Sequence, residues 1–259
     1  MKVVIFAGGL GTRISEETGT RPKPMVEIGG KPIIWHIMKG YAAHGYNEFI
    51  ICLGYKGYII KEYFMHYFLH NSDITIDVAN NQMEVHGTNS ENFKVTLVET
   101  GATTKTAGRL KKVQKYIGNE PFMLTYGDGV ADLDISNLVN FHLKHGKLAT
   151  VTAVNLEARF GGMDVDADGK VLAFREKAKD EGKWINAGFF VLSPDIFKYL
   201  EGNMEEMMWE DNPLEQLANA GELVAYHHHG FWKCMDALRD KIELEALWQE
   251  NNAPWKKWA

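Results

Sequence analysis

The segment 3-VVIFAGGLGTRISEETGTRPKPMVEIGGKP-32 decides how the rest of the sequence is interpreted. It begins with an uninterrupted apolar run, which is typical of a β-strand buried on both faces of a parallel sheet. A glycine-rich loop follows, and such a loop lets successive backbone N–H groups converge on a phosphate. A tight strand-to-helix turn is the alternative interpretation. The loop has neither the Walker A pattern nor the third glycine of the dinucleotide fingerprint, which disfavours a dehydrogenase.

Two cations in this segment favour the phosphate interpretation. Arg13 offers a forked pair of donors to phosphate oxygens. Lys23 stands between Pro22 and Pro24, which restrict the backbone and hold the ammonium in a preset position. An ordinary surface lysine is the alternative. Together the loop and the two cations predict a site for a polyphosphate.

Composition excludes several classes of protein. The chain has 259 residues, 45% of them hydrophobic and 24% charged, with a net charge of −6, which suits a globular protein with one sizeable core. Its cations form no basic stripe, so we expect no nucleic-acid partner. No stretch approaches the ~20 apolar residues of a membrane span. Cys52 and Cys234 have no metal-binding spacing, so we expect reduced thiols in a cytoplasmic protein.

The order of elements predicts an α/β fold with a doubly wound, mixed but mostly parallel sheet of the Rossmann-like kind. We expect one domain over residues 1–259, with a β-rich insertion near residues 71–95 and a hairpin over residues 163–174. The polar tail from residue 251 onward should lie at the surface. The expected strands are residues 3–7, 48–53, 121–126, 149–155, 184–192 and 223–228. The expected helices are residues 32–44, 57–69, 103–116, 134–145, 212–220 and 235–249.

The pattern G-G-x-G-T-R at residues 8–13, followed by P-K-P-M at residues 22–25, resembles the signature of the sugar-1-phosphate nucleotidyltransferases. This resemblance implies that the loop cradles a nucleoside triphosphate. It also implies that Arg13 and Lys23 are catalytic: Arg13 at the departing diphosphate, Lys23 between the two reacting phosphates. The implied nucleotide-binding residues of this segment are Ala7, Gly8, Gly9, Leu10, Gly11, Thr12, Arg13 and Lys23.

Two aspartates match the family's metal ligands. Asp128 lies in 124-LTYGDGVADLD-134, with Gly127 beside it at the nucleotide, and Asp236 lies in 227-HHHGFWKCMDALRD-240. The resemblance implies that both hold Mg²⁺, a hard ion that prefers oxygen ligands. Asp128 as a turn residue and Asp236 as a helix N-cap are the alternatives. The second motif departs from the family's usual W-x-D-x-G-T, because Asp236 is displaced and lacks the Gly-Thr.

Further matches place the sugar phosphate in a sugar-binding half from about residue 155 onward. They lie in 159-RFGGMDVDADGKV-171, in 171-VLAFREKAKDEGKWINAGFFVL-192 and in the second aspartate motif. The 166-DADGK-170 run lacks the remaining ligands of a calcium loop and suits a hairpin turn. The implied sugar-phosphate-binding residues are Gly161, Gly162, Glu176, Lys177, Asn186, Ala187, Gly188 and Trp232.

The segment 98-VETGATTKTAGRLKKV-113 and the departure at Asp236 resemble one branch of the family. That branch joins CTP and glucose 1-phosphate into CDP-glucose, a precursor of dideoxysugars in surface polysaccharides such as the O-antigen of lipopolysaccharide. Thr104 and Arg109 would then read the base. A uridylyl- or thymidylyltransferase and a non-catalytic sugar-nucleotide sensor are the alternatives. The resemblance also implies a homo-oligomer.

Three consecutive histidines, residues 227–229, invite a metal-binding interpretation. Neighbouring side chains of a strand point to opposite faces, so the three cannot converge on one ion. The sequence therefore predicts no metal centre at these histidines.

Overall fold

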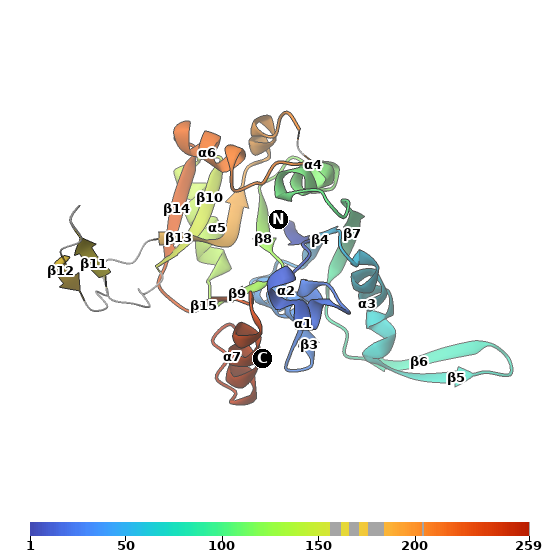
Figure 1. Ribbon diagram of the computed structural model, residues 1–259. Coiled ribbons are helices and arrows are strands. Elements are labelled where there is room, and N and C mark those ends of the chain that lie inside the picture. The colour runs from blue at the N-terminus through green and yellow to red at the C-terminus, as the bar shows by residue number, and fades with distance from the viewer. Residues whose placement is uncertain (156–161, 166–170, 176–183, 204, 259) are drawn as a thin grey trace.

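The computed structural model describes residues 1–155, 162–165, 171–175, 184–203 and 205–258. A seven-stranded sheet in the order β14-β10-β13-β8-β1-β4-β7 forms the centre of the molecule (Figure 1). Strand β13 runs antiparallel to both of its neighbours, and the other pairs are parallel. This confirms the expected mixed, mostly parallel α/β sheet. The strands are β1 (Val3–Ala7), β4 (Glu48–Leu53), β7 (Lys94–Glu99), β8 (Phe122–Tyr126), β10 (Ala149–Asn155), β13 (Trp184–Leu192) and β14 (Leu223–His228).

Strand β1 lies between two hydrophobic cores, which explains its continuous apolar run. Its residues alternate: Val3, Ile5 and Ala7 pack into one core, and Val4 and Phe6 pack into the other. Apolar residues of α2 join the first core and those of α4 the second. The helices are α1 (Ser15–Thr18), α2 (Ile33–Ala42), α3 (Gly57–His70), α4 (Thr106–Ile117), α5 (Ile135–His145), α6 (Asn212–Asn219) and α7 (Leu238–Gln249), with 3₁₀ turns η1 (Thr12–Ile14), η2 (Lys23–Met25) and η3 (Pro194–Tyr199).

Local chemistry sets the ends of α5. The carboxylate of Asp134 accepts a hydrogen bond from the backbone N–H of Asn137 at 2.9 Å, which satisfies a free donor of the first turn. Gly146 follows the helix at φ 65°, a left-handed conformation that favours glycine. Helix α5 thus begins and ends where the sequence predicts.

Within the described residues, four two-stranded ribbons accompany the central sheet. A hairpin of β5 and β6 projects from the body beyond α3 (Figure 1). The expected hairpin near residue 170 is present as β11 and β12, and its turn lies outside the described residues. The ribbons are β2 (Glu27–Ile28) with β3 (Lys31–Pro32), β5 (Ser72–Asp77) with β6 (Gln82–Thr88), β9 (Gly129–Ala131) with β15 (Trp232–Cys234), and β11 (Gly162–Val165) with β12 (Val171–Arg175).

The tail lies at the surface only in part, because Asn251, Asn252, Lys256 and Lys257 are exposed but Trp255 is buried. Trp255 is only 2% exposed, and its indole N–H points to Nδ1 of His36 at 3.4 Å. Burial lowers the pKa of His36 to about 4, so the ring is neutral and can donate from Nε2 to the carbonyl of Ile28 at 2.8 Å. Aromatic packing between α2 and α7 outweighs the polar composition of the tail.

Several element boundaries also differ from the sequence prediction, among them the start of α4 at Thr106 rather than at residue 103. Strand β7 falls partly inside the expected insertion but is the edge strand of the central sheet, paired with β4. Helix α7 begins at Leu238 rather than at residue 235, because Met235 still continues the pairing of β15 by donating its N–H to the carbonyl of Asp128. Among the described residues, no helix has the length and apolar character needed to cross a membrane.

Candidate active site

The site lies where β1 and β8 end side by side, at the carboxyl edge of the sheet, where α/β folds place ligands. The loop after β1 carries residues 8–12, and Asp128 follows β8 directly. Gly127 lies so close to β1 that a Cβ would be 2.7 Å from the carbonyl oxygen of Phe6. Only glycine fits this approach, which brings Asp128 next to the phosphate-loop candidate.

A short ribbon brings the second aspartate to the first across more than 100 residues of chain. Strand β15 pairs antiparallel with β9, so that Cys234 lies opposite Gly129. One further hydrogen bond extends this pairing: the N–H of Met235 donates to the carbonyl of Asp128 at 2.8 Å. Asp236 therefore follows β15 directly beside Asp128. The two aspartates singled out in the sequence lie together.

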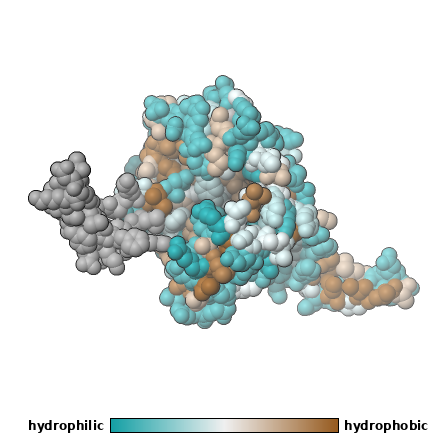
Figure 2. Space-filling view, viewed as in Figure 1, coloured by the Kyte–Doolittle hydropathy of each residue, from teal (hydrophilic) through white to brown (hydrophobic). Residues whose placement is uncertain are grey.

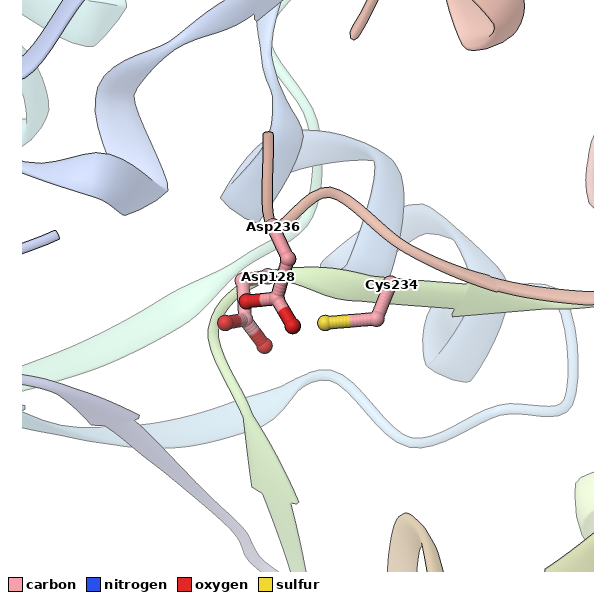
Figure 3. Close-up of side chains that lie close together, drawn as sticks. All are labelled: Asp128, Cys234 and Asp236. Carbon is pink, nitrogen blue, oxygen red and sulfur yellow. The ribbon is translucent and has the colours of Figure 1, made fainter. Parts of the chain in front are cut away.

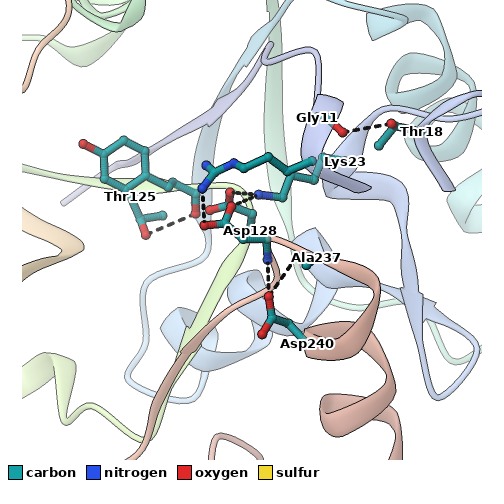
Figure 4. A network of polar contacts seen from close by, with 10 residues as sticks. Gly11, Thr18, Lys23, Thr125, Asp128, Ala237 and Asp240 are labelled. Atoms are coloured by element: carbon teal, nitrogen blue, oxygen red, sulfur yellow. Dashed lines mark hydrogen bonds and ion pairs between the residues drawn. The ribbon is translucent and has the colours of Figure 1, made fainter. Parts of the chain in front are cut away.

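Four charged side chains, Arg13, Lys23, Asp128 and Asp236, form what we call the charge cluster. The ammonium of Lys23 donates to Asp128 Oδ2 and to Asp236 Oδ1, each at 2.6 Å (Figure 4). The guanidinium of Arg13 donates to Asp236 Oδ2 at 2.9 Å. The structure thus brings together both expected catalytic cations and both expected metal ligands.

The two cations differ in exposure. The side chain of Lys23 is 11% exposed, whereas that of Arg13 is 75% exposed. Burial on its own lowers the pKa of Lys23, but Asp128 and Asp236 more than offset it, and the pKa lies above its ordinary value. Lys23 is therefore a fixed ammonium, and Arg13 is a charge that a ligand can reach.

Asp236 is not the N-cap of α7. The N-cap is Ala237, and the carboxylate of Asp240 in the first turn accepts from the backbone N–H groups of Asp236 at 3.1 Å and Ala237 at 2.8 Å (Figure 4). The alternative interpretation of Asp236 as a helix cap is therefore wrong. Its carboxylate is available to a cation.

The residues present fit a divalent ion. The carboxylates of Asp128 and Asp236 already share one cation, the ammonium of Lys23. A ligand atom of each, together with Sγ of Cys234, lies within 4.8 Å of the others (Figure 3). Carboxylate oxygens are suitable ligands for Mg²⁺, whereas sulfur prefers softer ions. Within the described part of the chain, this is the one group of three such side chains.

A pocket of about 250 Å³ opens beside the charge cluster. Gly188 lines it at φ 81°, and a Cβ there would be 2.2 Å from the Tyr126 ring, so glycine is required. The indole N–H of Trp232 donates to the carbonyl of Ala187 at 2.8 Å, and Oδ1 of Asn186 accepts from the N–H of Gly188 at 2.7 Å. The lining residues are Arg13, Thr125, Tyr126, Asp128, Gly129, Asn186, Ala187, Gly188, Phe189, Trp232, Cys234 and Asp236.

Four of the expected sugar-phosphate residues are not among those that line the pocket. Gly161, Glu176 and Lys177 lie outside the described residues, and their roles stay predictions. Gly162 opens β11, paired with Arg175. The sugar-phosphate residues that the structure places in the pocket are Asn186, Ala187, Gly188 and Trp232.

The phosphate-loop candidate is open to solvent. Gly9 and Thr12 are exposed, and Leu10 is 57% exposed. Gly11 adopts φ 64° and starts the 3₁₀ turn η1, in which the N–H of Ile14 donates to the Gly11 carbonyl at 3.1 Å. The backbone of this loop is accessible to a ligand, as a phosphate cradle requires.

The expected base-reading residues have protein partners. The guanidinium of Arg109, 4% exposed, donates to the carbonyls of Leu53 at 2.9 Å, Gly101 at 2.9 Å and Gly8 at 3.0 Å. It thereby ties together the chain at the ends of β4, β7 and β1. The hydroxyl of Thr104 donates to Glu205. Contact of either residue with a base stays a prediction.

Sequence reasoning missed five residues that line the pocket: Thr125, Tyr126, Gly129, Phe189 and Cys234. The phenol of Tyr126 donates to Glu210, and burial and that carboxylate raise its pKa above the ordinary value. A signal for Cys234 was present, because residues two apart on an extended segment face the same side, and Asp236 is two residues away.

The geometry of loop, cations and paired carboxylates agrees with a comparison of sequences. The family model described as "Nucleotidyl transferase" matches residues 2–245. The chain belongs to this nucleotidyl transferase family. Among curated family members, the glucose-1-phosphate cytidylyltransferase of Salmonella typhi is 57% identical over 259 residues, covering 100% of both chains. A probable glucose-1-phosphate cytidylyltransferase of Bacillus subtilis (strain 168) is 46% identical over 260 residues, again covering 100% of both.

Solved structures resemble this nucleotidyl transferase in fold. HddC from Yersinia pseudotuberculosis aligns with a TM-score of 0.69 at 26% identity, covering 95% of this chain and 99% of that one. The doubly wound sheet is therefore shared with a solved structure over nearly the whole length of both proteins.

Proposed function

We propose that this protein is a glucose-1-phosphate cytidylyltransferase, which converts CTP and α-D-glucose 1-phosphate into CDP-glucose and diphosphate. One observation carries the proposal: 57% identity, without truncation of either chain, to the curated enzyme of Salmonella typhi. The geometry of the site supports it, because Arg13 and the two carboxylates that hold Lys23 line one pocket.

In the proposed reaction, a phosphate oxygen of glucose 1-phosphate attacks the α-phosphorus of CTP in line. The new P–O bond forms as the bond to the departing diphosphate breaks. The nucleophile is already an anion, so no general base is required, and catalysis consists of positioning and charge neutralisation. Lys23, held in place by two carboxylates, would meet the reacting phosphates, and the exposed Arg13 would meet the departing diphosphate.

Asp128 and Asp236 would hold Mg²⁺ with nucleotide phosphate oxygens. When bound, the ion supplies positive charge at the phosphates. Lys23 contacts only Oδ2 of Asp128 and Oδ1 of Asp236, so the second oxygen of each carboxylate would be left for the ion while the ammonium keeps its place.

Sugar and base would occupy opposite sides of this centre. We propose that residues 186–188 and Trp232 contact the sugar, with Glu176 at its hydroxyls and Lys177 at its phosphate. For the base, the segment with Thr104 and Arg109 is the candidate. The guanidinium of Arg109 is committed to backbone carbonyls, so it would act largely by fixing the loop beside the nucleotide.

The proposed product, CDP-glucose, would feed synthesis of dideoxysugars for surface polysaccharide, in the cytoplasm. This biosynthetic role and this compartment rest on the proposed activity alone.

We further propose a homo-oligomer, with the β5–β6 hairpin as its contact. Ile74 lies opposite Val85, and Ile76 lies opposite Met83, so one face of the hairpin is apolar (Figure 2). Ile76 is 60% exposed. An isolated two-stranded hairpin is marginally stable in water, and an exposed apolar face of this kind marks a contact surface. A second copy of the chain would cover it.

The experiment is a diphosphate-release assay with glucose 1-phosphate, Mg²⁺ and each of CTP, UTP, dTTP and GTP. The proposal expects release with CTP well above the other three. Release with UTP or dTTP but not CTP would overturn the cytidylyl assignment. Nucleotide binding without any release would point instead to a sugar-nucleotide sensor.

A further inference from the structure

Cys234 lies among the metal-ligand candidates although the proposed reaction gives it no task. Its Sγ and one oxygen each of Asp128 and Asp236 lie within 4.8 Å of one another, and the three side chains converge (Figure 3). All three line the pocket, so an ion from solvent can reach them.

We propose that Asp128, Asp236 and Cys234 form a site for one soft divalent cation of the Zn²⁺ or Cd²⁺ class. Two carboxylates and one thiolate make three protein ligands, and the open pocket leaves the fourth position of a tetrahedral site to water. Soft ions gain from sulfur, whereas Mg²⁺ takes oxygen ligands and keeps several waters. On binding, the thiol proton is released to solvent and the sulfur binds the ion.

The same geometry makes the soft ion a competitor of the proposed Mg²⁺ ion. It would take both carboxylates that the proposed Mg²⁺ site needs and that Lys23 now bridges at 2.6 Å each. Soft metals would therefore exclude Mg²⁺ from this centre. This inference concerns binding, so it stands or falls separately from the proposed activity.

Because the chain has two cysteines, a thiolate signal can be assigned to one or the other. Cys52 is 0% exposed within the sheet, where Cd²⁺ cannot reach its thiol. Titration of the whole protein with Cd²⁺ alone, followed by the ultraviolet thiolate-to-cadmium charge-transfer band, should show saturation at one ion per chain. Histidines give no such band, so metal binding at exposed histidines such as His66 and His70 does not interfere.

Cys234→Ser should lose the band, Cys52→Ala should keep it, and Asp236→Asn should weaken the binding that it reports. Adding Mg²⁺ to the cadmium-loaded protein should diminish the band as the two ions compete. A band that persists in Cys234→Ser, a wild-type protein without a band, or a band insensitive to both Mg²⁺ and Asp236→Asn would overturn the proposal. Circular dichroism of each variant checks that it is folded.

Discussion

At the scale of single residues, Arg109 shows how burial redirects a charged side chain. A cation near a nucleotide site suggests contact with the ligand, but here its guanidinium donates to Leu53, Gly101 and Gly8. Gly8 is part of the same arrangement, since a Cβ there would lie 2.1 Å from Arg109 Nη1. The glycine makes room for the arginine, and the arginine fixes the loop.

This arrangement predicts that Arg109→Ala costs stability. Removing the guanidinium leaves buried carbonyls without their donor, at about 1–3 kcal/mol for each group left unpaired. We expect the free energy of unfolding, measured in urea, to fall by about 3 kcal/mol. Gly8→Ala should also destabilise, because its methyl group displaces the guanidinium. Unchanged unfolding in both variants would remove the structural role of Arg109.

The two aspartates near the start of α7 should separate function from stability. Asp236→Asn removes a carboxylate from the charge cluster and should strongly reduce Mg²⁺-dependent turnover while the melting temperature changes little. Asp240→Ala removes the capping carboxylate of α7 and should cost about 1 kcal/mol of stability. Steady-state assays and thermal melts of the two variants decide the point. If the two variants changed turnover and melting temperature equally, the functional role of Asp236 and the structural role of Asp240 would be contradicted.

At the scale of elements, the β9–β15 ribbon is the feature that the sequence could least reveal. Its strands are three residues each, and they pair across about a hundred residues. Neither hydrophobic period nor turn chemistry marks such a short ribbon. The family resemblance, not the local pattern, brought Asp128 and Asp236 into one hypothesis. Cys234 was missed because only this pairing brings its sulfur beside Asp128.

The capping carboxylate of α7 also makes a prediction about pH. Burial on its own raises the pKa of Asp240. The backbone donors and Lys233 lower it by more, so the pKa lies below its ordinary value of 3.8. A depressed folded-state pKa means that the stabilisation is present above the unfolded value and is lost as pH falls through the folded value. Acid unfolding below about pH 4 should therefore be less steep in Asp240→Asn than in wild type. Identical acid transitions would contradict this.

The central strands were the most predictable elements. The apolar run of β1 serves two cores at once, a pattern that few other structures produce. Strand β7 was harder to assign, because its KVTLVE sequence alternates like an insertion strand although it pairs with β4. The burial of Trp255 in the tail was missed for a similar reason, since its partner His36 on α2 is distant in sequence.

At the scale of the whole molecule, the β5–β6 hairpin should control assembly. Ile76→Lys places a charge on its apolar face, whereas Thr75→Lys places the same charge on the opposite, polar face. We expect Ile76→Lys to shift the protein toward monomer in light scattering, because the buried contact cannot accommodate a charge. Thr75→Lys is the matched control and should retain the wild-type mass. A monomeric wild type, or equal masses for all three, would contradict the proposed contact.

The central claim is that a fixed ammonium at the paired carboxylates drives cytidylyl transfer, and one measurement tests it most directly. The rate of CDP-glucose formation from CTP and glucose 1-phosphate, identified by mass spectrometry, is compared between wild type, Lys23→Ala and the control Lys94→Ala, whose side chain is 76% exposed. Loss of about 3–4 kcal/mol of transition-state stabilisation should slow Lys23→Ala by roughly two to three orders of magnitude, while Lys94→Ala keeps the wild-type rate. A wild type that forms no CDP-glucose, or a Lys23→Ala rate within about threefold of wild type, would contradict the account.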